Sequence, residues 1–180
     1  TIDGIAFEKC PKLKKITVDK ENENFTVDKY GVLYTLDKTT LVKCPPATSM
    51  QSYTVPDSVN KIQSLAFADC SALNKINIPD SVFSIGNNAF ENCGYYNNKS
   101  NWKNDVLYIG NHLVCSEATG KLTVINGTVN IADGVFRKTK ATEIILPSSM
   151  RRIGFNSFAY GNTLKKITLN EGLEYISARA

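Results

Sequence analysis

The segment IQSLAFADC at residues 62–70 returns in closely similar form 23 residues later, as IGNNAFENC at residues 85–93. Its phenylalanine recurs along the chain, with separations of 23, 46 and 22 residues between Phe67, Phe90, Phe136 and Phe158. The chain therefore has an internal period of about 23 residues, with one degenerate copy between the second and third of these positions. Such a period is typical of repeat architectures, in which each repeat is one small structural unit.

Each repeat also carries a short triplet in which apolar, polar and apolar residues alternate, which predicts one strand per repeat. The predicted strands are Ile16–Val18, Tyr53–Val55, Ile76–Ile78, Leu122–Val124 and Ile167–Leu169. Prolines at positions 56, 79 and 147 end three strands of this kind, since proline removes a backbone donor from the ladder. The segment around each phenylalanine is too short for a full helix, so we expect one helical turn there.

A strand, a proline corner and a helical turn cannot bury their own apolar side, so the repeats must stack on one another. The period falls within the leucine-rich repeat range of roughly 20 to 29 residues. The sequence therefore predicts an α/β solenoid, a right-handed leucine-rich repeat coil with short parallel strands on one face and short helical turns on the other. In such a coil the repeated phenylalanines line up in a column.

Two segments, VPDSVNKIQSLAFADCSALNKINIP and IPDSVFSIGNNAFENC, resemble the BspA-type leucine-rich repeats of bacterial and protozoan surface proteins. The resemblance covers nearly the whole chain. It departs from the repeat pattern at Thr139 and Gly161, where the repeat cysteine is replaced. The resemblance implies a surface protein, because members of this family are associated with adhesion to host matrix proteins and to other cells.

Residues 19–50 and 94–120 interrupt the simple repeat but resemble each other. Within them, YGVLYTLDKTTLVKCP and NDVLYIGNHLVC share a Val-Leu-Tyr followed by Leu-Val, and the Gly-Asn of the second suits a two-residue primed turn. Both segments are predicted to be inserted β-hairpins. They are either solenoid coils with extra strands or a recognition surface. The second interpretation would use the nearby aromatic residues Tyr95, Tyr96 and Trp102.

Both ends of the sequence fall inside a repeat. Residues 176–180 align with residues 85–89, so the next residue is expected to be a phenylalanine. A solenoid also needs polar caps over its terminal coils. Residues 1–180 are therefore expected to form a single solenoid fragment, truncated at both ends. A native stop codon directly after Ala180 would contradict this expectation.

The composition is that of an ordinary globular chain: 180 residues, 42% hydrophobic, 21% charged, with a net charge of +4. The positive charges are spread along the chain rather than gathered in a basic run, so nucleic acid is not an expected partner. No apolar stretch approaches the roughly 18 residues of a membrane span, so this chain is not expected to insert into a membrane. We expect a monomer.

The five cysteines predict neither a disulfide framework nor a metal site. Cys10, Cys70 and Cys93 share one slot, three residues after a phenylalanine, where a small buried thiol packs well. Cys44 and Cys115 end the two hairpins and are also interpreted as packing residues. The odd total and the absence of a CxxC pair argue against disulfide scaffolding and against zinc.

Catalytic motifs were sought as a nucleophile, a base and an orienting group. His112 is the single histidine, and its place beside the Gly-Asn turn suggests a solvated hairpin residue. The sequence has no glycine-rich phosphate loop, serine elbow or HExxH motif. A pair of carboxylates would suffice for a glycosidase, but no pair is singled out. The sequence thus predicts no enzyme, no catalytic residues and no cofactor.

The outward positions of the strands carry the candidate binding residues. In each strand the residue between the two inward residues points outward. The residue just before the first inward residue also points outward, and this preceding position is a lysine in four of six strands. These residues either keep the sheet solvated and resistant to aggregation, or form a shallow basic strip that meets an acidic surface and weakens with salt. The candidate binding residues are Lys15, Thr17, Thr54, Lys75, Asn77, Lys121, Thr123, Lys166 and Thr168.

Two functions are compatible with this sequence. One is an extracellular or cell-surface adhesion module that uses the repeat surface to contact a protein or glycan on host or neighbouring cells. The other is a structural spacer or targeting repeat of a larger multidomain protein. Binding of the isolated chain to matrix proteins and glycans would distinguish them.

Overall fold

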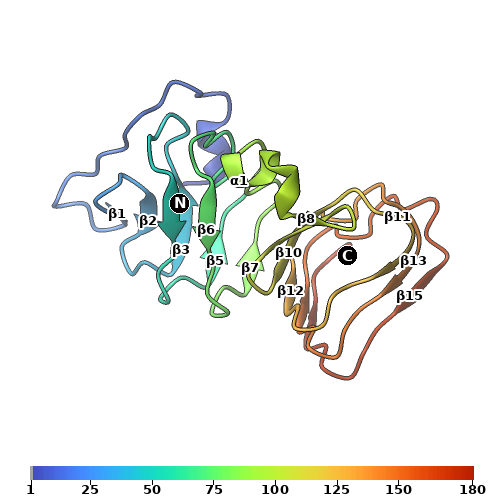
Figure 1. Cartoon of the computed structure of the whole chain (residues 1–180). Helices are drawn as coiled ribbons and strands as arrows, with labels where there is room; N and C mark the ends of the chain where they lie inside the picture. Colours follow the sequence, from blue (N-terminus) through green and yellow to red (C-terminus); the bar gives the residue numbers. More distant parts are fainter. Residues whose placement is uncertain (1) are drawn as a thin grey trace. The chain divides into compact units, whose positions relative to one another are not determined.

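The computed structural model describes residues 2–180, and its contacts divide the chain after Asn101 into two compact units. Both units consist of short strands joined by turns (Figure 1). Three short helical segments accompany them: the 3-10 helices η1 (Gly4–Phe7) and η2 (Lys99–Asn101) and the α-helix α1 (Gly94–Asn97). No helix among residues 2–180 has the length and apolarity needed to cross a bilayer.

The first unit contains two sheets, of five strands in the order β1-β2-β3-β5-β7 and of two strands, β4-β6. The strands are β1 (Phe25–Val27), β2 (Leu33–Thr35), β3 (Thr40–Lys43), β4 (Ser52–Thr54), β5 (Lys61–Ile62), β6 (Lys75–Asn77) and β7 (Ser84–Ile85). Parallel pairing joins Tyr53 to Ile76 in one sheet and Ile62 to Ile85 in the other. Both pairs are 23 residues apart, so each coil gives one strand to each sheet.

The second unit repeats this plan, with sheets of six strands, β16-β14-β12-β10-β9-β8, and of three, β11-β13-β15. In Figure 1 these two sheets lie on opposite sides of the yellow-to-red coils. The strands are β8 (Trp102–Lys103), β9 (Val106–Ile109), β10 (His112–Ser116), β11 (Thr119–Thr123), β12 (Asn130–Ile131), β13 (Lys140–Ile145), β14 (Arg152–Ile153), β15 (Lys166–Thr168) and β16 (Tyr175–Ile176). The predicted solenoid is confirmed, with a second sheet added to the predicted one, which is parallel between coils and antiparallel within the hairpin.

The repeated phenylalanines stack inside each unit as the period predicts. The rings of Phe67 and Phe90 are 5.4 Å apart and nearly parallel, and those of Phe136 and Phe158 are also 5.4 Å apart. The ring of Tyr53 packs against Phe67 at 5.8 Å in a tilted arrangement. Each coil that keeps the repeat phenylalanine thus adds its ring to a core that no single coil could enclose.

The turn that carries each phenylalanine differs from the helical turn expected there. Leu65 and Asp69, on either side of Phe67, have positive φ angles of 57° and 63°, and Asn88 and Asn92 repeat this pattern around Phe90. A left-handed residue interrupts an α-helix, and asparagine tolerates this conformation better than most residues. These segments are therefore turns, and among residues 2–180 only η1 has helical geometry at a repeat phenylalanine.

The left-handed residues also redirect the backbone of the turn toward the next coil. The amide of Phe67 donates to the carbonyl oxygen of Ala89 at 2.7 Å, and the amide of Asp69 donates to that of Glu91 at 2.9 Å. In an α-helix these donors would bond within their own segment. The turns consequently form a hydrogen-bonded stack between coils.

The repeat prolines begin turns, as expected. The amides of Val59 and Val82 donate to the carbonyl oxygens of Pro56 and Pro79 at 3.0 and 3.1 Å. Proline suits this position because it has no backbone N–H to continue the strand ladder, while its carbonyl oxygen still accepts the bond that closes the turn.

Both predicted hairpins are present, since β2 pairs antiparallel with β3, and β9 with β10. A third strand extends each hairpin, β1 beside β2 and β8 beside β9. The returning strands β3 and β10 then join the parallel sheets through β5 and β12. The hairpins are therefore coils of the solenoid with extra strands, as the structural interpretation of these segments predicts.

One predicted strand, Ile16–Val18, is wrong, because these residues run outside the sheets. The turn of residues 28–32 contacts both this segment and β4, where the strand would have paired. A Cβ placed on Gly31 would lie 3.3 Å from the carbonyl oxygen of Ile16, while the ring of Tyr30 packs edge-on against Tyr53 of β4 at 6.0 Å. The inserted turn thus takes the place of the ladder.

Close approach of two coils requires a glycine after β7. A Cβ on Gly86 would lie 2.3 Å from the backbone nitrogen of Ser64, and the Gly86 amide donates to the carbonyl oxygen of Ile62 at 2.8 Å. We expect Gly86→Ala to lower the free energy of unfolding by about 1–3 kcal/mol, because the coils must separate to admit the methyl group. Urea denaturation followed by circular dichroism measures this.

The matched control is Gly161→Ala, where the nearest atom to the added methyl group is 3.1 Å away. This smaller overlap should cost less stability than the change at Gly86. Equal unfolding free energies for the two variants would show that the backbone contact at Gly86 does not limit the spacing of the coils.

Candidate functional site

The nine candidate binding residues divide between the two units, five in the first and four in the second. In the first unit, Thr54, Lys75 and Asn77 lie on the outward side of the β4-β6 sheet and are exposed, as predicted. Asn77 donates from Nδ2 to Thr54 Oγ1 at 3.3 Å across the two strands. Lys15 and Thr17 are also exposed, but they belong to the segment that forms no strand.

In the second unit, Lys121, Thr123 and Lys166 are exposed, whereas Thr168 is half-buried. The register of β11, β13 and β15 places Glu143 between the two lysines, opposite both. Its carboxylate forms ion pairs with Lys121 Nζ at 3.5 Å and with Lys166 Nζ at 3.3 Å. These lysines, the hydrogen-bonded Lys166 foremost, lower the pKa of Glu143. One carboxylate therefore partly offsets the two basic side chains of this face.

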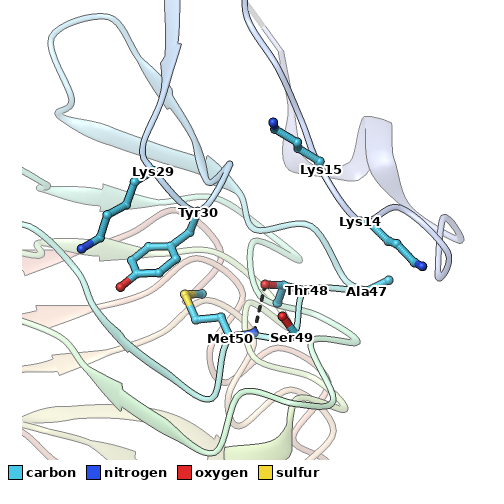
Figure 2. Close-up of a pocket in the computed structure, with 8 residues that line it drawn as sticks. All are labelled: Lys14, Lys15, Lys29, Tyr30, Ala47, Thr48, Ser49 and Met50. Carbon is cyan, nitrogen blue, oxygen red and sulfur yellow. Dashed lines mark hydrogen bonds between the residues drawn. The ribbon is translucent and has the colours of Figure 1, made fainter.

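A cavity of about 620 Å³ in the first unit was not predicted from the sequence. Three separate segments form it, and Figure 2 shows Lys29 and Tyr30 on one side, Lys14 and Lys15 on the other, and residues 47–50 between them. Lys15 leans toward the side of Tyr30 in this view, and Lys14 leans away. Thr48, Ser49 and the sulfur-bearing Met50 line the part between the two walls.

Asp28 holds the turn that presents Lys29 and Tyr30. Its Oδ1 accepts hydrogen bonds from the amides of Tyr30 and Val32, both at 2.9 Å. Its Oδ2 accepts a hydrogen bond of 2.6 Å from the hydroxyl of Tyr53 in β4. Burial raises the pKa of Tyr53, which keeps this phenol protonated as a donor. The wall of the cavity is thereby fixed to the core of the unit.

The aromatic residues of the proposed recognition surface are less exposed than that interpretation would favour. Tyr95 and Tyr96 in α1 and Trp102 in β8 are all half-buried, and burial raises the pKa of Tyr95. A role of these residues in recognition stays a prediction.

The cysteines and the histidine depart in part from expectation. Cys44, Cys70 and Cys93 are buried, as predicted, whereas Cys115 is half-buried and Cys10 is exposed. His112 is fully buried rather than solvated. Its strand β10 lies between β9 and β12 in the six-stranded sheet. Residues 2–180 contain no cluster of three side chains suited to bind a metal ion.

Comparison with known proteins identifies the repeat. A family model described as a BspA type leucine rich repeat region, with six copies, matches residues 43–120 and 97–180. The two matches overlap and together span residues 43–180, which is most of the chain. No curated protein sequence matches the chain.

Two solved structures share the fold. A leucine-rich cell surface protein from Faecalibacterium prausnitzii is 25% identical, with a TM-score of 0.51 over 97% of this chain and 45% of that one. A leucine-rich repeat protein from Eubacterium ventriosum is 19% identical, with a TM-score of 0.50 over 99% of this chain and 54% of that one. The chain thus spans about half the length of these two proteins. Since the family model covers most of the sequence and its repeat is the coil seen in both units, the chain belongs to the BspA-type leucine-rich repeat family.

Proposed function

We propose that the chain is an extracellular or cell-surface binding module, which contacts a protein or glycan of a host or neighbouring cell through its repeat surface. The supporting observation is the row of exposed polar side chains that the strand register repeats from coil to coil, as in Lys75 beside Ser52 and Lys166 beside Glu143. Solenoids typically use such extended surfaces for binding, and leucine-rich repeat proteins are typically not enzymes. The similar Faecalibacterium protein is described as a cell surface protein, which supports the location.

The ion pairs of Glu143 favour a second candidate function, a structural spacer or targeting repeat. A face whose lysine charges are partly offset within the chain has less attraction left for an acidic partner. The two candidate functions make different predictions for the Glu143→Gln variant: stronger binding to an acidic partner for a binding module, and no binding for a spacer.

Glu143→Gln should strengthen binding to an acidic partner about two- to fivefold, because it leaves Lys121 and Lys166 without their carboxylate. The measurement is surface plasmon resonance against immobilised matrix proteins and glycans at low and high salt. The gain should shrink at high salt, since these groups are exposed.

Glu171→Gln is the matched control, because Glu171 is exposed in the same unit and lies outside these ion pairs. It should leave binding unchanged. Lys75→Ala, in the first unit, should weaken binding if the outward face of β6 takes part. If no member of the panel binds the chain or its Glu143→Gln variant, the spacer function is favoured.

A further inference from the structure

We propose that the cavity between residues 14–15, 29–30 and 47–50 binds a saccharide that carries a carboxylate, as a uronic acid does. This inference rests on the proposed function and narrows it to one site and one class of ligand. The cavity belongs to the first unit, whereas the strand face that carries Glu143 belongs to the second. Its volume of about 620 Å³ is within the range of small-ligand sites, roughly 300–1,000 Å³.

The first reason to expect an anionic ligand is the unpaired positive charge of the lining. Lys14, Lys15 and Lys29 are exposed, and none of them forms an ion pair with a carboxylate of residues 2–180. Lys121 and Lys166 instead share Glu143. A hollow lined by three lysines, with Lys15 leaning toward the side of Tyr30, attracts an anion more strongly than a strand face whose charges are offset within the chain.

A second basic hollow, in the other unit, is a weaker candidate for the same ligand. It measures about 200 Å³ and is lined by Arg137, Lys138 and Lys140 together with Glu117. The carboxylate of Glu117 belongs to the lining itself and so opposes an incoming anion. The larger cavity has no acidic residue in its lining.

The second reason is the aromatic ring beside these charges. Tyr30 is 45% exposed although its ring packs edge-on against Tyr53, and the ammonium of Lys29 lies 4.9 Å from the centre of its ring. A sugar ring presents apolar C–H groups on its face and polar groups at its edge. Tyr30 can pack against the C–H face of the sugar, while Lys29 and Lys15 attract a carboxylate at its polar edge.

Hydroxyl groups complete the lining. Thr48 Oγ1 accepts a hydrogen bond from the amide of Met50 at 3.2 Å, which leaves its proton available to donate. Ser49 is exposed at the same place. Such hydroxyls match the donor and acceptor pattern of a sugar.

The backbone between the two walls argues against an acidic peptide as the occupant. The amide of Ala47 donates to Leu13 at 2.9 Å and that of Thr48 to Pro45 at 3.1 Å, in addition to the Met50 bond. Peptides gain much of their affinity from main-chain hydrogen bonds. Most of the donors of this segment are already engaged, whereas a saccharide needs only the side chains.

The test is a titration of the whole chain with the unsulfated hyaluronan disaccharide, glucuronic acid linked to N-acetylglucosamine, followed by NMR chemical shifts. Diacetylchitobiose serves as the neutral sugar of similar size, and a hexapeptide of alternating aspartate and glutamate as the acidic peptide. We expect the uronate disaccharide to bind at least fivefold more tightly than either of the others.

Variants then locate the site. Lys15→Ala and Lys29→Ala should each weaken uronate binding about two- to fivefold. Tyr30→Ala should weaken it about three- to tenfold by removing the aromatic face. Lys12→Ala is the matched control, because Lys12 is an exposed lysine outside the lining. It should leave the affinity unchanged, and the two lysine variants keep the test independent of any structural effect of losing Tyr30.

The proposal is overturned if the uronate disaccharide does not bind, if diacetylchitobiose or the peptide binds equally well, or if Lys12→Ala and Lys29→Ala lose the same affinity. These outcomes leave the wider proposed function standing, since that depends on the panel binding and on Glu143→Gln. Conversely, specific uronate binding without binding to any matrix protein or glycan of the panel would support the cavity as a binding site and not the strand face.

Discussion

Replacing Phe67 with alanine is expected to lower the free energy of unfolding by about 3–5 kcal/mol, because a large ring disappears from a closed stack. Phe67 is fully buried, and its ring lies between Tyr53 at 5.8 Å and Phe90 at 5.4 Å. Neither neighbour can fill the space alone, since each is held in its own coil by parallel strand pairing. Urea denaturation monitored by far-ultraviolet circular dichroism measures the loss.

Phe83→Ala is the matched control, since Phe83 belongs to the same unit but is 46% exposed. It should cost much less stability than Phe67→Ala. Similar losses for the two variants would mean that the ring stack is not the main source of cohesion between the coils.

The second large effect is expected at Asp133, the partner of a buried arginine. Arg152 is 5% exposed, and its Nη2 lies 3.2 Å from Asp133 Oδ1 and 3.0 Å from Ser177 Oγ. The same carboxylate oxygen accepts a hydrogen bond of 2.8 Å from the amide of Phe155. Asp133→Ala should lower the free energy of unfolding by roughly 3 kcal/mol, because it removes this compensating charge from a buried guanidinium.

A double variant separates the charge from simple loss of contacts. Arg152→Met together with Asp133→Ala should be less destabilising than Asp133→Ala alone, since no charge is then left buried. Unfolding free energies of the two single variants and the double variant complete the cycle. Strict additivity would show that the ion pair contributes no coupling energy.

The solenoid was predictable because the alternating apolar and polar residues of each strand are visible in the local sequence and recur at a fixed period. Tyr53 and Ile76 pair in register as the spacing requires, and so do Ile144 and Ile167. The triplet at Ile16–Val18 has the same pattern but failed as a strand prediction. A turn more than ten residues later occupies the place beside it, and this contact depends on the tertiary structure rather than on the local sequence.

The candidate site was predictable only in part. The exposure of Lys75, Lys121 and Lys166 follows from strand alternation. The neutralising role of Glu143 could also have been found, because the period places it between the two lysines of its sheet. The cavity could not have been predicted, because its lining comes from three segments that the inserted turn around Tyr30 brings together.

The turns around Phe67 and Phe90 join neighbouring coils by backbone hydrogen bonds, and the strands of both sheets join the same coils by parallel pairing. A single residue inserted within a paired strand would put that ladder out of step, whereas the segments between strands tolerate one, since Asn130 and Arg152 pair across 22 residues and Ile144 and Ile167 across 23. Larger changes in length are therefore expected as whole coils, while the tips of the hairpins can accept extra residues. Natural length variation, and any engineered extension, should follow that rule.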